Sequence, residues 1–318
     1  MQKIILIGIV LILLASVNFA EATWQYTADA GITVKPIISG NNIFIGSQDG
    51  NLHSIFLNNG RLIWKKQVGK YVLQPILFQN SIIVANNNGT VTKLKKDGTI
   101  ESQFNVPQVN SKIKTIFGID SSQNKVYLTT DAGVFTLEAN NVTNFFNYST
   151  AVQYTSPTIS GSNIIFGAGN ELIAVNTNKQ VVWRNKVADF WISKPVVENS
   201  IVYIGAQDNS IYAFNLLNGD LRWRYETNGW VASTPHFQDG IIYVGSNDGY
   251  LYALDAFSGS LKWKAKTNQA IQTTPLSTAF AGKNALLVGS TDEKLYVIEK
   301  ETGKIIWRFV AGDWVATQ

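Results

Sequence analysis

The sequence predicts an all-β fold made of repeats about forty residues long, and three features of the 318-residue chain carry this prediction. A phrase that ends in tryptophan is clearest at residues 245–263 and recurs, with small changes, at 46–64, 205–223 and 289–307. Short apolar or alternating runs are separated by clusters of Gly, Asn and Asp, which is typical of strands and turns. After residue 22 no apolar pattern has the 3.6-residue period of a helix.

The first complete repeat predicts four short strands. Its apolar or alternating runs are residues 34–39, 43–47, 52–56 and 61–66. Four antiparallel strands repeated radially every forty residues make the blades of a β-propeller. The pairs Asp49-Gly50 and Asp248-Gly249, and also Asp208-Asn209, are interpreted as primed two-residue hairpin turns with positive φ at their centre.

Regularly spaced tryptophans mark the end of each repeat. They are Trp24, Trp64, Trp183, Trp223, Trp263 and Trp307, and Phe104 and Phe145 fill the gap in the series. A large ring at one fixed place in each blade can bury about 150 to 250 Å² between neighbouring sheets. We therefore interpret Trp64, Trp183, Trp223, Trp263 and Trp307 as structural docking residues.

The repeats number seven complete blades. Their first strands are expected to begin near Pro36, Pro75, Thr115, Pro157, Pro195, Pro235 and Pro275. Trp24 and the residues after it resemble one more fourth strand. The sequence is thus compatible with seven blades plus an extra N-terminal strand, or with an eight-bladed plan that is cut short after Gln318.

Residues 253–263 and 213–223 closely resemble the tryptophan-docking repeat of pyrroloquinoline-quinone-like (PQQ-like) β-propellers. This family includes quinoprotein alcohol dehydrogenases and outer-membrane assembly propellers of the BamB type. The resemblance covers residues 24–318 and is weakest between about 85 and 150. It implies a propeller over residues 23–318.

The N-terminus resembles a secretory signal peptide over residues 1–22. Met1-Gln2-Lys3 precedes an apolar run from Ile4 to Ala15, and Ala20-Glu21-Ala22 matches a small-residue cleavage site. The propeller is therefore expected in the periplasm or outside the cell, with an uncleaved leader as the alternative that tethers it to a membrane.

Composition restricts the partners. The chain has no cysteine, which excludes disulfides and a lipid-modified cysteine, and in this it departs from BamB-type lipoproteins. The net charge of +4 is small and no basic run occurs, so no nucleic-acid partner is expected. We expect a monomer that binds protein partners. Asn88, Asn141 and Asn147 each begin a glycosylation acceptor triplet or a chance match to one.

The sequence favours a protein that is not an enzyme. Quinoprotein dehydrogenases of the family that this chain resembles hold a quinone near calcium and, in several types, beside a disulfide of adjacent cysteines. This chain has no cysteine and no blade with clustered acidic residues. Its two histidines, His53 and His236, lie in distant repeats, and His53 takes the place of a tyrosine expected to pack on a strand. No metal and no resident cofactor are predicted, with pyrroloquinoline quinone as the alternative.

Candidate binding residues lie where each fourth strand leads to the next first strand. Tyr71, Trp191, Trp230 and Trp314 stand seven or eight residues after a blade tryptophan. They are expected either to plug the seam between blades or to form an aromatic rim at the channel mouth. Lys35, Lys114 and Lys194 precede first strands and form either a positive collar for anions or solvated side chains.

These features together predict an exported, non-enzymatic β-propeller that acts as a protein-interaction scaffold similar to BamB-type envelope assembly proteins. One alternative is a quinone- or small-ligand-binding sensor module. The other is a quinoprotein dehydrogenase-like subunit.

Overall fold

The computed structural model describes residues 5–7, 24–32, 34–107, 115–122, 125–138, 141–148, 154–187 and 193–310. These residues form strands and no helix, and the strands build seven four-stranded antiparallel sheets. The fold is a seven-bladed β-propeller with an extra N-terminal strand, as the sequence predicts. By contact density the chain divides into two compact units, with the boundary between Ser162 and Asn163, and each unit is described by itself.

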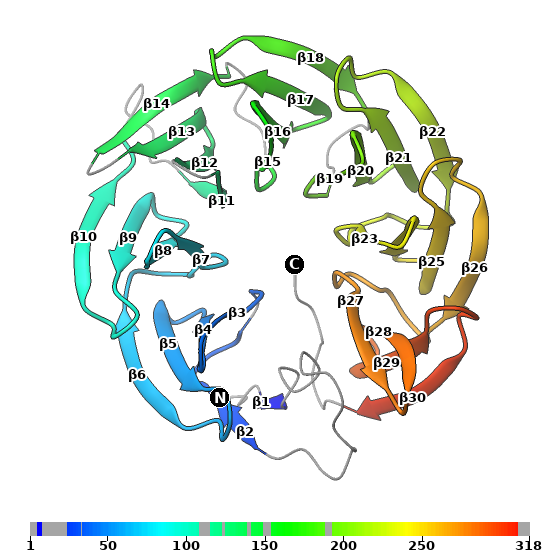
Figure 1. Cartoon of the computed structure of the whole chain (residues 1–318), viewed down its shortest axis with the longest axis horizontal. Coiled ribbons are helices and arrows are strands. Elements are labelled where there is room, and N and C mark those ends of the chain that lie inside the picture. Colours follow the sequence, from blue (N-terminus) through cyan, green and yellow to red (C-terminus); the bar gives the residue numbers. More distant parts are fainter. Residues whose placement is uncertain are drawn as a thin grey trace. The chain divides into compact units, whose positions relative to one another are not determined.

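The first unit contains three complete blades. Blade 1 is β3 (Ile37–Ser39), β4 (Asn42–Gly46), β5 (Asn51–Phe56) and β6 (Leu62–Gln67). Blade 2 is β7 (Ile76–Phe78), β8 (Ser81–Ala85), β9 (Thr90–Leu94) and β10 (Ile100–Asn105), and blade 3 is β11 (Ile116–Ser121), β12 (Val126–Thr130), β13 (Gly133–Glu138) and β14 (Asn141–Asn147). In each blade the first strand is innermost and the fourth is outermost (Figure 1).

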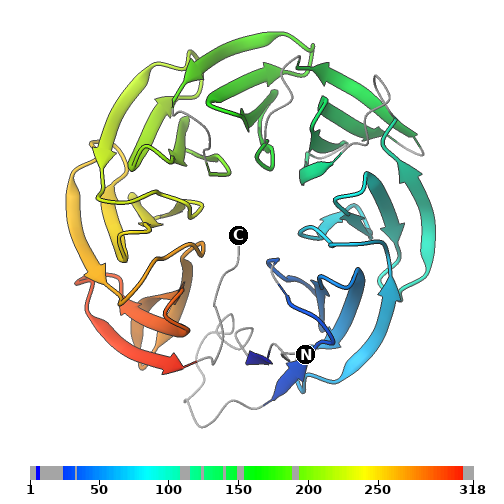
Figure 2. The ribbon, with the colours of Figure 1, turned by 180° about the vertical axis from the view of Figure 1, so that it is seen from behind.

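Two short strands precede blade 1. They are β1 (Ile5–Ile7) and β2 (Gln25–Thr27), which pair antiparallel with each other. From both sides β2 is seen beside blade 1 (Figures 1 and 2). Strand β1 lies inside the segment that the sequence predicts to be a signal peptide.

The remaining strands continue the same plan. Blade 4 is β15 (Thr158–Ser160), β16 (Asn163–Ala168), β17 (Glu171–Asn176) and β18 (Val181–Lys186); blade 5 is β19 (Val196–Glu198), β20 (Ile201–Gly205), β21 (Ser210–Asn215) and β22 (Leu221–Glu226). Blade 6 is β23 (His236–Gln238), β24 (Ile241–Gly245), β25 (Tyr250–Asp255) and β26 (Leu261–Lys266); blade 7 is β27 (Leu276–Phe280), β28 (Lys283–Ser290), β29 (Lys294–Glu299) and β30 (Ile305–Val310).

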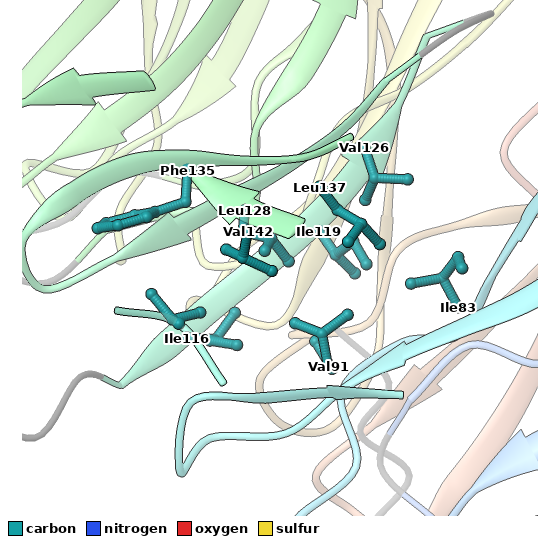
Figure 3. Close-up of a cluster of buried hydrophobic side chains, with 11 residues drawn as sticks. Ile83, Val91, Ile116, Ile119, Val126, Leu128, Phe135, Leu137 and Val142 are labelled. Atoms are coloured by element: carbon teal, nitrogen blue, oxygen red, sulfur yellow. The ribbon is translucent and has the colours of Figure 1, made fainter. Parts of the chain in front are cut away.

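The core lies between blades, since the two middle strands of a blade have neighbours on both faces. Strands β8 and β20 are buried at every residue, whereas β6 is mostly exposed. Between blades 2 and 3, Ile83 and Val91 face a cluster that includes Ile119 and Leu128 (Figure 3). Near-continuous apolar strands are typical of sheets covered on both faces.

The acidic turns differ from the predicted type. Positive φ occurs at Gly50 (86°) and Gly249 (83°) but not at Asp49 or Asp248. In blade 1, Gly50 N–H donates to Ser47 O at 3.0 Å and Ser47 N–H donates to Asn51 O at 2.9 Å. This is a longer turn with a left-handed glycine, so the prediction of a primed two-residue turn at these Asp-Gly pairs is wrong. At Asp208-Asn209, too, only Asn209 has positive φ (65°). The aspartate avoids the left-handed region, and its carboxylate instead accepts a backbone N–H of the turn.

Four of the five docking tryptophans, all but Trp307, contact the next blade in two ways. The Trp223 indole Nε1–H donates to Ala256 O at 2.9 Å. Its ring also covers Gly259, where an added Cβ would lie 2.6 Å from Trp223 Cδ2. The same donor, acceptor carbonyl and glycine recur for Trp64 (Lys96 O at 3.0 Å, Gly98), Trp183 (Leu216 O at 2.8 Å, Gly219) and Trp263 (Lys300 O at 2.7 Å, Gly303).

Blade 2 lacks a residue of this kind. In blade 5 the tryptophan follows a bulge, with Trp223 opposite Ala213. In blade 2 the residue after the bulge is Ser102, opposite Lys93. The interpretation of Phe104 as the tryptophan equivalent is therefore wrong by two residues, because equal spacing in the sequence does not reveal the position of a bulge.

Blade 3 retains an aromatic contact. Phe145 lies edge-on to Tyr127, with ring centroids 5.4 Å apart. In blade 5, Tyr203 packs on Trp223 in a tilted arrangement, with ring centroids 6.0 Å apart. The residue opposite Thr136, as Trp223 is opposite Ala213, is however Thr143, so the interpretation of Phe145 as the tryptophan equivalent is also wrong by two residues.

Trp307 differs from the other blade tryptophans. Its side chain is 41% exposed, against 8% for Trp223. It packs on Phe280 and Phe309, at 5.8 and 5.9 Å between ring centroids, but within the described residues its indole nitrogen donates to no carbonyl. This ring is used within its own blade.

The first prediction compares two tryptophans. Trp223→Ala removes a buried ring and leaves a cavity between blades 5 and 6, so we expect a loss of about 3 to 5 kcal/mol of unfolding free energy. Trp307→Ala removes a half-exposed ring, and we expect less than half of that loss. Urea denaturation followed by circular dichroism measures both; equal losses would contradict the docking role of Trp223.

The second prediction uses two glycines with nearly equal φ, Gly259 (73°) and Gly240 (75°). An added Cβ at Gly240 meets nothing within 4 Å, whereas at Gly259 it meets Trp223. Gly240→Ala should cost only the backbone term of about 1 to 2 kcal/mol. Gly259→Ala should cost clearly more in the same denaturation experiment, and a double variant with Trp223→Ala should remove the excess.

Candidate interaction surface

The loop between β22 and β23 displays one predicted aromatic on a fixed backbone. Trp230 is 52% exposed. Its carbonyl accepts Asn247 N–H at 2.8 Å, and the next residue donates its N–H to Ala206 O at 3.0 Å. Asn228 N–H donates to Asp248 Oδ2 at 3.0 Å. Turns of blades 5 and 6 therefore hold the loop on both sides and leave the indole in solvent.

Tyr71 stands in the corresponding loop between β6 and β7. It is 55% exposed and has a φ of 50°, which is unusual for an aromatic residue. Before it, Asn86 Nδ2 donates to Val68 O at 2.9 Å, and Gly69 packs so tightly on Asn86 that a Cβ would meet Nδ2 at 1.8 Å. A backbone held in this way keeps Tyr71 directed outward.

The other predicted binding residues have different outcomes. Trp191, Trp314 and Lys114 lie outside the described residues. Lys35 is exposed. Lys194 is half-buried and already takes part in an interaction within the protein. The lysine collar and the aromatic rim therefore stay predictions.

A hydrogen-bonded chain that the sequence does not reveal anchors β2 to blade 1. His53 is fully buried and its Nδ1 lies 2.7 Å from the Tyr26 hydroxyl. Its Nε2 lies 2.8 Å from Ser47 Oγ, and this hydroxyl donates to Asp49. With Ser47 as donor to Asp49, His53 donates through Nε2 and accepts from Tyr26 at Nδ1. Burial lowers the pKa of His53, and this effect outweighs that of the nearby Asp49 carboxylate, which acts to raise the pKa.

In blades 5, 6 and 7 a tyrosine occupies the place of His53. Tyr212, Tyr252 and Tyr296 each donate to the aspartate of the preceding turn, as in the 2.6 Å bond from Tyr252 to Asp248. Burial and the bond to Asp208 raise the pKa of Tyr212 to about 12. These phenols remain protonated donors that brace the turns. Across the described ranges no group of three or more His, Asp or Glu side chains could hold a metal ion.

A second polar cluster links blades 6 and 7. His236 Nε2 lies 2.6 Å from Ser277 Oγ, and Gln238 Oε1 accepts from both Ser277 and Lys300, the latter at 2.5 Å. Lys300 is only 7% exposed, and burial lowers its pKa, although the Asp239 and Glu301 carboxylates raise it. The sequence contains a signal for this cluster, because Lys300 stands at the repeat position that Ala256 occupies in blade 6.

Comparison with known proteins identifies the class of protein to which this chain belongs. The fold and its tryptophan docking are those of PQQ-like repeat β-propellers. A sequence model of the family described as "Outer membrane protein assembly factor BamB" matches residues 17–141 and 147–232, and the chain belongs to this family. A Yersinia pestis protein of that description is 27% identical over 197 residues, which are 56% of this chain and 49% of that protein. The chain thus matches about half the length of this relative.

Solved structures support the same fold. The computationally designed Ika8 protein matches with a TM-score of 0.76 and 18% identity over 91% of this chain and 90% of its own. BamB from Moraxella catarrhalis matches with a TM-score of 0.63 and 18% identity, over 87% and 83% of the two chains. The quinohemoprotein alcohol dehydrogenase ADHIIG from Pseudomonas putida HK5 matches with a TM-score of 0.73 and 12% identity, over 93% and 69%.

In the described part of the chain no helix has the length and apolarity that a membrane span requires.

The third prediction concerns pH. The pKa of His53 is lower in the folded protein than its unfolded value of about 6.5, so the unfolded chain takes up the proton first. The unfolding free energy should therefore fall as the pH drops below about 6.5. Midpoints of urea unfolding between pH 5 and pH 8 measure this loss. His53→Gln should remove it and His236→Gln should leave it; the same slope in the His53 variant would contradict the assignment.

Proposed function

We propose that this chain is an exported, monomeric interaction module of the cell envelope that binds other proteins through the loop that carries Trp230; the loop that carries Tyr71, in the other compact unit, is a separate candidate. Family membership supports the class, because the Yersinia pestis relative is described as an outer membrane protein assembly factor. The observation that carries the proposal is the exposed indole of Trp230 on a loop fixed by turns of two blades. Exposed Trp and Tyr on rigid backbones lose little entropy on binding and are frequent hot spots of interfaces.

The proposed interaction module needs no catalytic step and no resident cofactor. The phenols and carboxylates of the acidic turns are bonded to one another within their blades, which supports a structural role for them. Retention of pyrroloquinoline quinone and calcium by the purified protein, seen as near-ultraviolet absorbance after removal of the excess, would favour the quinone-binding alternative instead.

The fourth prediction tests the loop directly. A photo-crosslinking phenylalanine analogue replaces Trp230, and the protein is expressed in the envelope of its host. Phe257 is equally exposed, at 55%, but lies in the turn between β25 and β26, so the same analogue there is the matched control. We expect discrete protein adducts from position 230 and not from position 257.

The partner identified by these adducts then permits a quantitative test. Trp230→Ala should weaken its binding by about 2 kcal/mol, or about 30-fold, and Phe257→Ala should have little effect. Equal adducts at both positions, or no adduct at either, would contradict the proposed surface.

A further inference from the structure

Two lysines and a tyrosine of blade 6 adjoin the turn that holds the Trp230 loop. The Lys264 and Lys266 ammonium groups lie over the Tyr250 ring, 4.6 Å and 4.5 Å from its centroid. Both lysines are exposed and the ring is half-buried. Contact between a cation and an aromatic face is a weak attraction at a solvated site. The ring therefore positions the two ammonium groups and leaves them able to bind an anion.

The turn before β25 connects these side chains with the Trp230 loop. Asn228, two residues before Trp230, donates its N–H to Asp248 Oδ2 at 3.0 Å. Tyr250 N–H donates to the other oxygen of Asp248, also at 3.0 Å, and Tyr250 pairs with Lys266 across the sheet. The loop and the lysines thus lie on either side of one turn, and both belong to the second compact unit.

The two lysines have no carboxylate partner among the described residues. Lys262, on the same strand, forms a 3.2 Å ion pair with Asp255, whereas Lys264 and Lys266 form none within the described ranges. Asp248, in the adjoining turn, already accepts a phenol and two backbone N–H groups. Two positive charges are therefore left uncompensated beside the Trp230 loop.

The repeat itself does not account for the pair of Tyr250 and Lys266. Tyr250 begins the third strand of blade 6, and Lys266 stands three residues after the docking tryptophan. The pairs at the same place in the other blades with a tryptophan are Asn51 with Gln67, Glu171 with Lys186, Ser210 with Glu226 and Lys294 with Val310. None of these four pairs joins an aromatic ring to a cation. Docking between blades therefore does not require Tyr250 or Lys266, which favours a role in binding.

We infer that the surface at the Trp230 loop continues over Tyr250, Lys264 and Lys266, and that it binds an acidic protein segment. Acidic side chains of this segment pair with the two lysines, and an apolar group beside them covers the Trp230 indole. Such charge pairs speed association and select among partners, whereas a buried aromatic anchor supplies most of the affinity. The inference rests on the proposed function, because it names the chemistry of the partner that the Trp230 loop binds.

The charges around the loop favour a peptide segment over an anionic lipid surface. On the blade 5 side, Arg224 is paired with Glu226 at 3.1 Å, and the Glu226 side chain is 72% exposed. That side of the loop thus adds no excess positive charge. Basic clusters that bind membranes contain about 4 to 8 Lys or Arg side chains. Two lysines suit the carboxylates of one extended segment better.

The test uses random peptides displayed on phage and selected on the purified protein. We expect the selected peptides to be rich in Asp and Glu and to contain an aromatic or aliphatic residue. A synthetic peptide of the most frequent sequence should bind about tenfold more weakly when Lys264→Gln and Lys266→Gln are combined. Its affinity should also fall as salt is raised and in the Trp230→Ala variant. Calorimetry measures each affinity.

The matched control combines Lys262→Gln with Lys304→Gln. These lysines are exposed and lie at the start of β26 and just before β30, so the same charge is removed from other places. The control should bind the peptide as the unaltered protein does. Equal losses in the two double variants, or selected peptides without an excess of acidic residues, would overturn the inference.

Lipid vesicles distinguish a membrane ligand from a protein segment. We expect no cosedimentation with vesicles of phosphatidylglycerol or of phosphatidylcholine. Cosedimentation with phosphatidylglycerol alone, abolished by combining Lys264→Gln with Lys266→Gln, would assign the lysines to a membrane and overturn the inference. In any of these cases, adducts from position 230 that persist when both lysines are replaced would leave the proposed function intact.

Discussion

The fold depends on one repeated contact, in which the indole of one blade donates to a carbonyl of the next and covers a glycine beside it. Trp223, Ala256 and Gly259 provide the clearest example. The contact is strong because it combines a buried hydrogen bond with a large apolar area, and it is specific because only a residue without a Cβ fits under the ring. Where the contact occurs, from blades 1, 4, 5 and 6 to the blade that follows, it stabilises both neighbours, as in other repeat proteins with nearest-neighbour cores.

The period of the tryptophans made the architecture predictable, and the alternation of short apolar runs made the strands predictable. The two roles of glycines such as Gly259, in the turn and as the surface under a tryptophan ring, were not predictable. A turn signal in the sequence does not show that a ring from the preceding blade lies on the glycine. The error at Phe104 has a similar origin, because a bulge moves the docking position to Ser102 without changing the spacing. The turn at Asp49 has only its glycine in the left-handed region, and composition alone does not separate that turn from a primed one.

The position of the candidate surface residues was predictable, but the contacts that hold their loops were not. Spacing from a blade tryptophan indicated Tyr71 and Trp230, and both are more than half exposed. The rigidity of the Trp230 loop comes from Asp248 and other turn residues that are distant in the sequence. The bond between His53 and Tyr26 likewise joins residues of different strands. The sequence shows that His53 takes the place of a tyrosine, but only the structure shows that it pairs with Tyr26.

The bond from Trp223 to Ala256 also bears on how the protein withstands proteases. Blades 5 and 6 are joined covalently by the loop at residues 227–235 and non-covalently by the bond from the Trp223 indole to Ala256 O. A protease that cuts this loop at its exposed residues, Asn228 or Trp230, severs the first connection and leaves the second. The nicked protein would keep its two blades together until the indole contact opens, so cleavage and loss of structure are separate events.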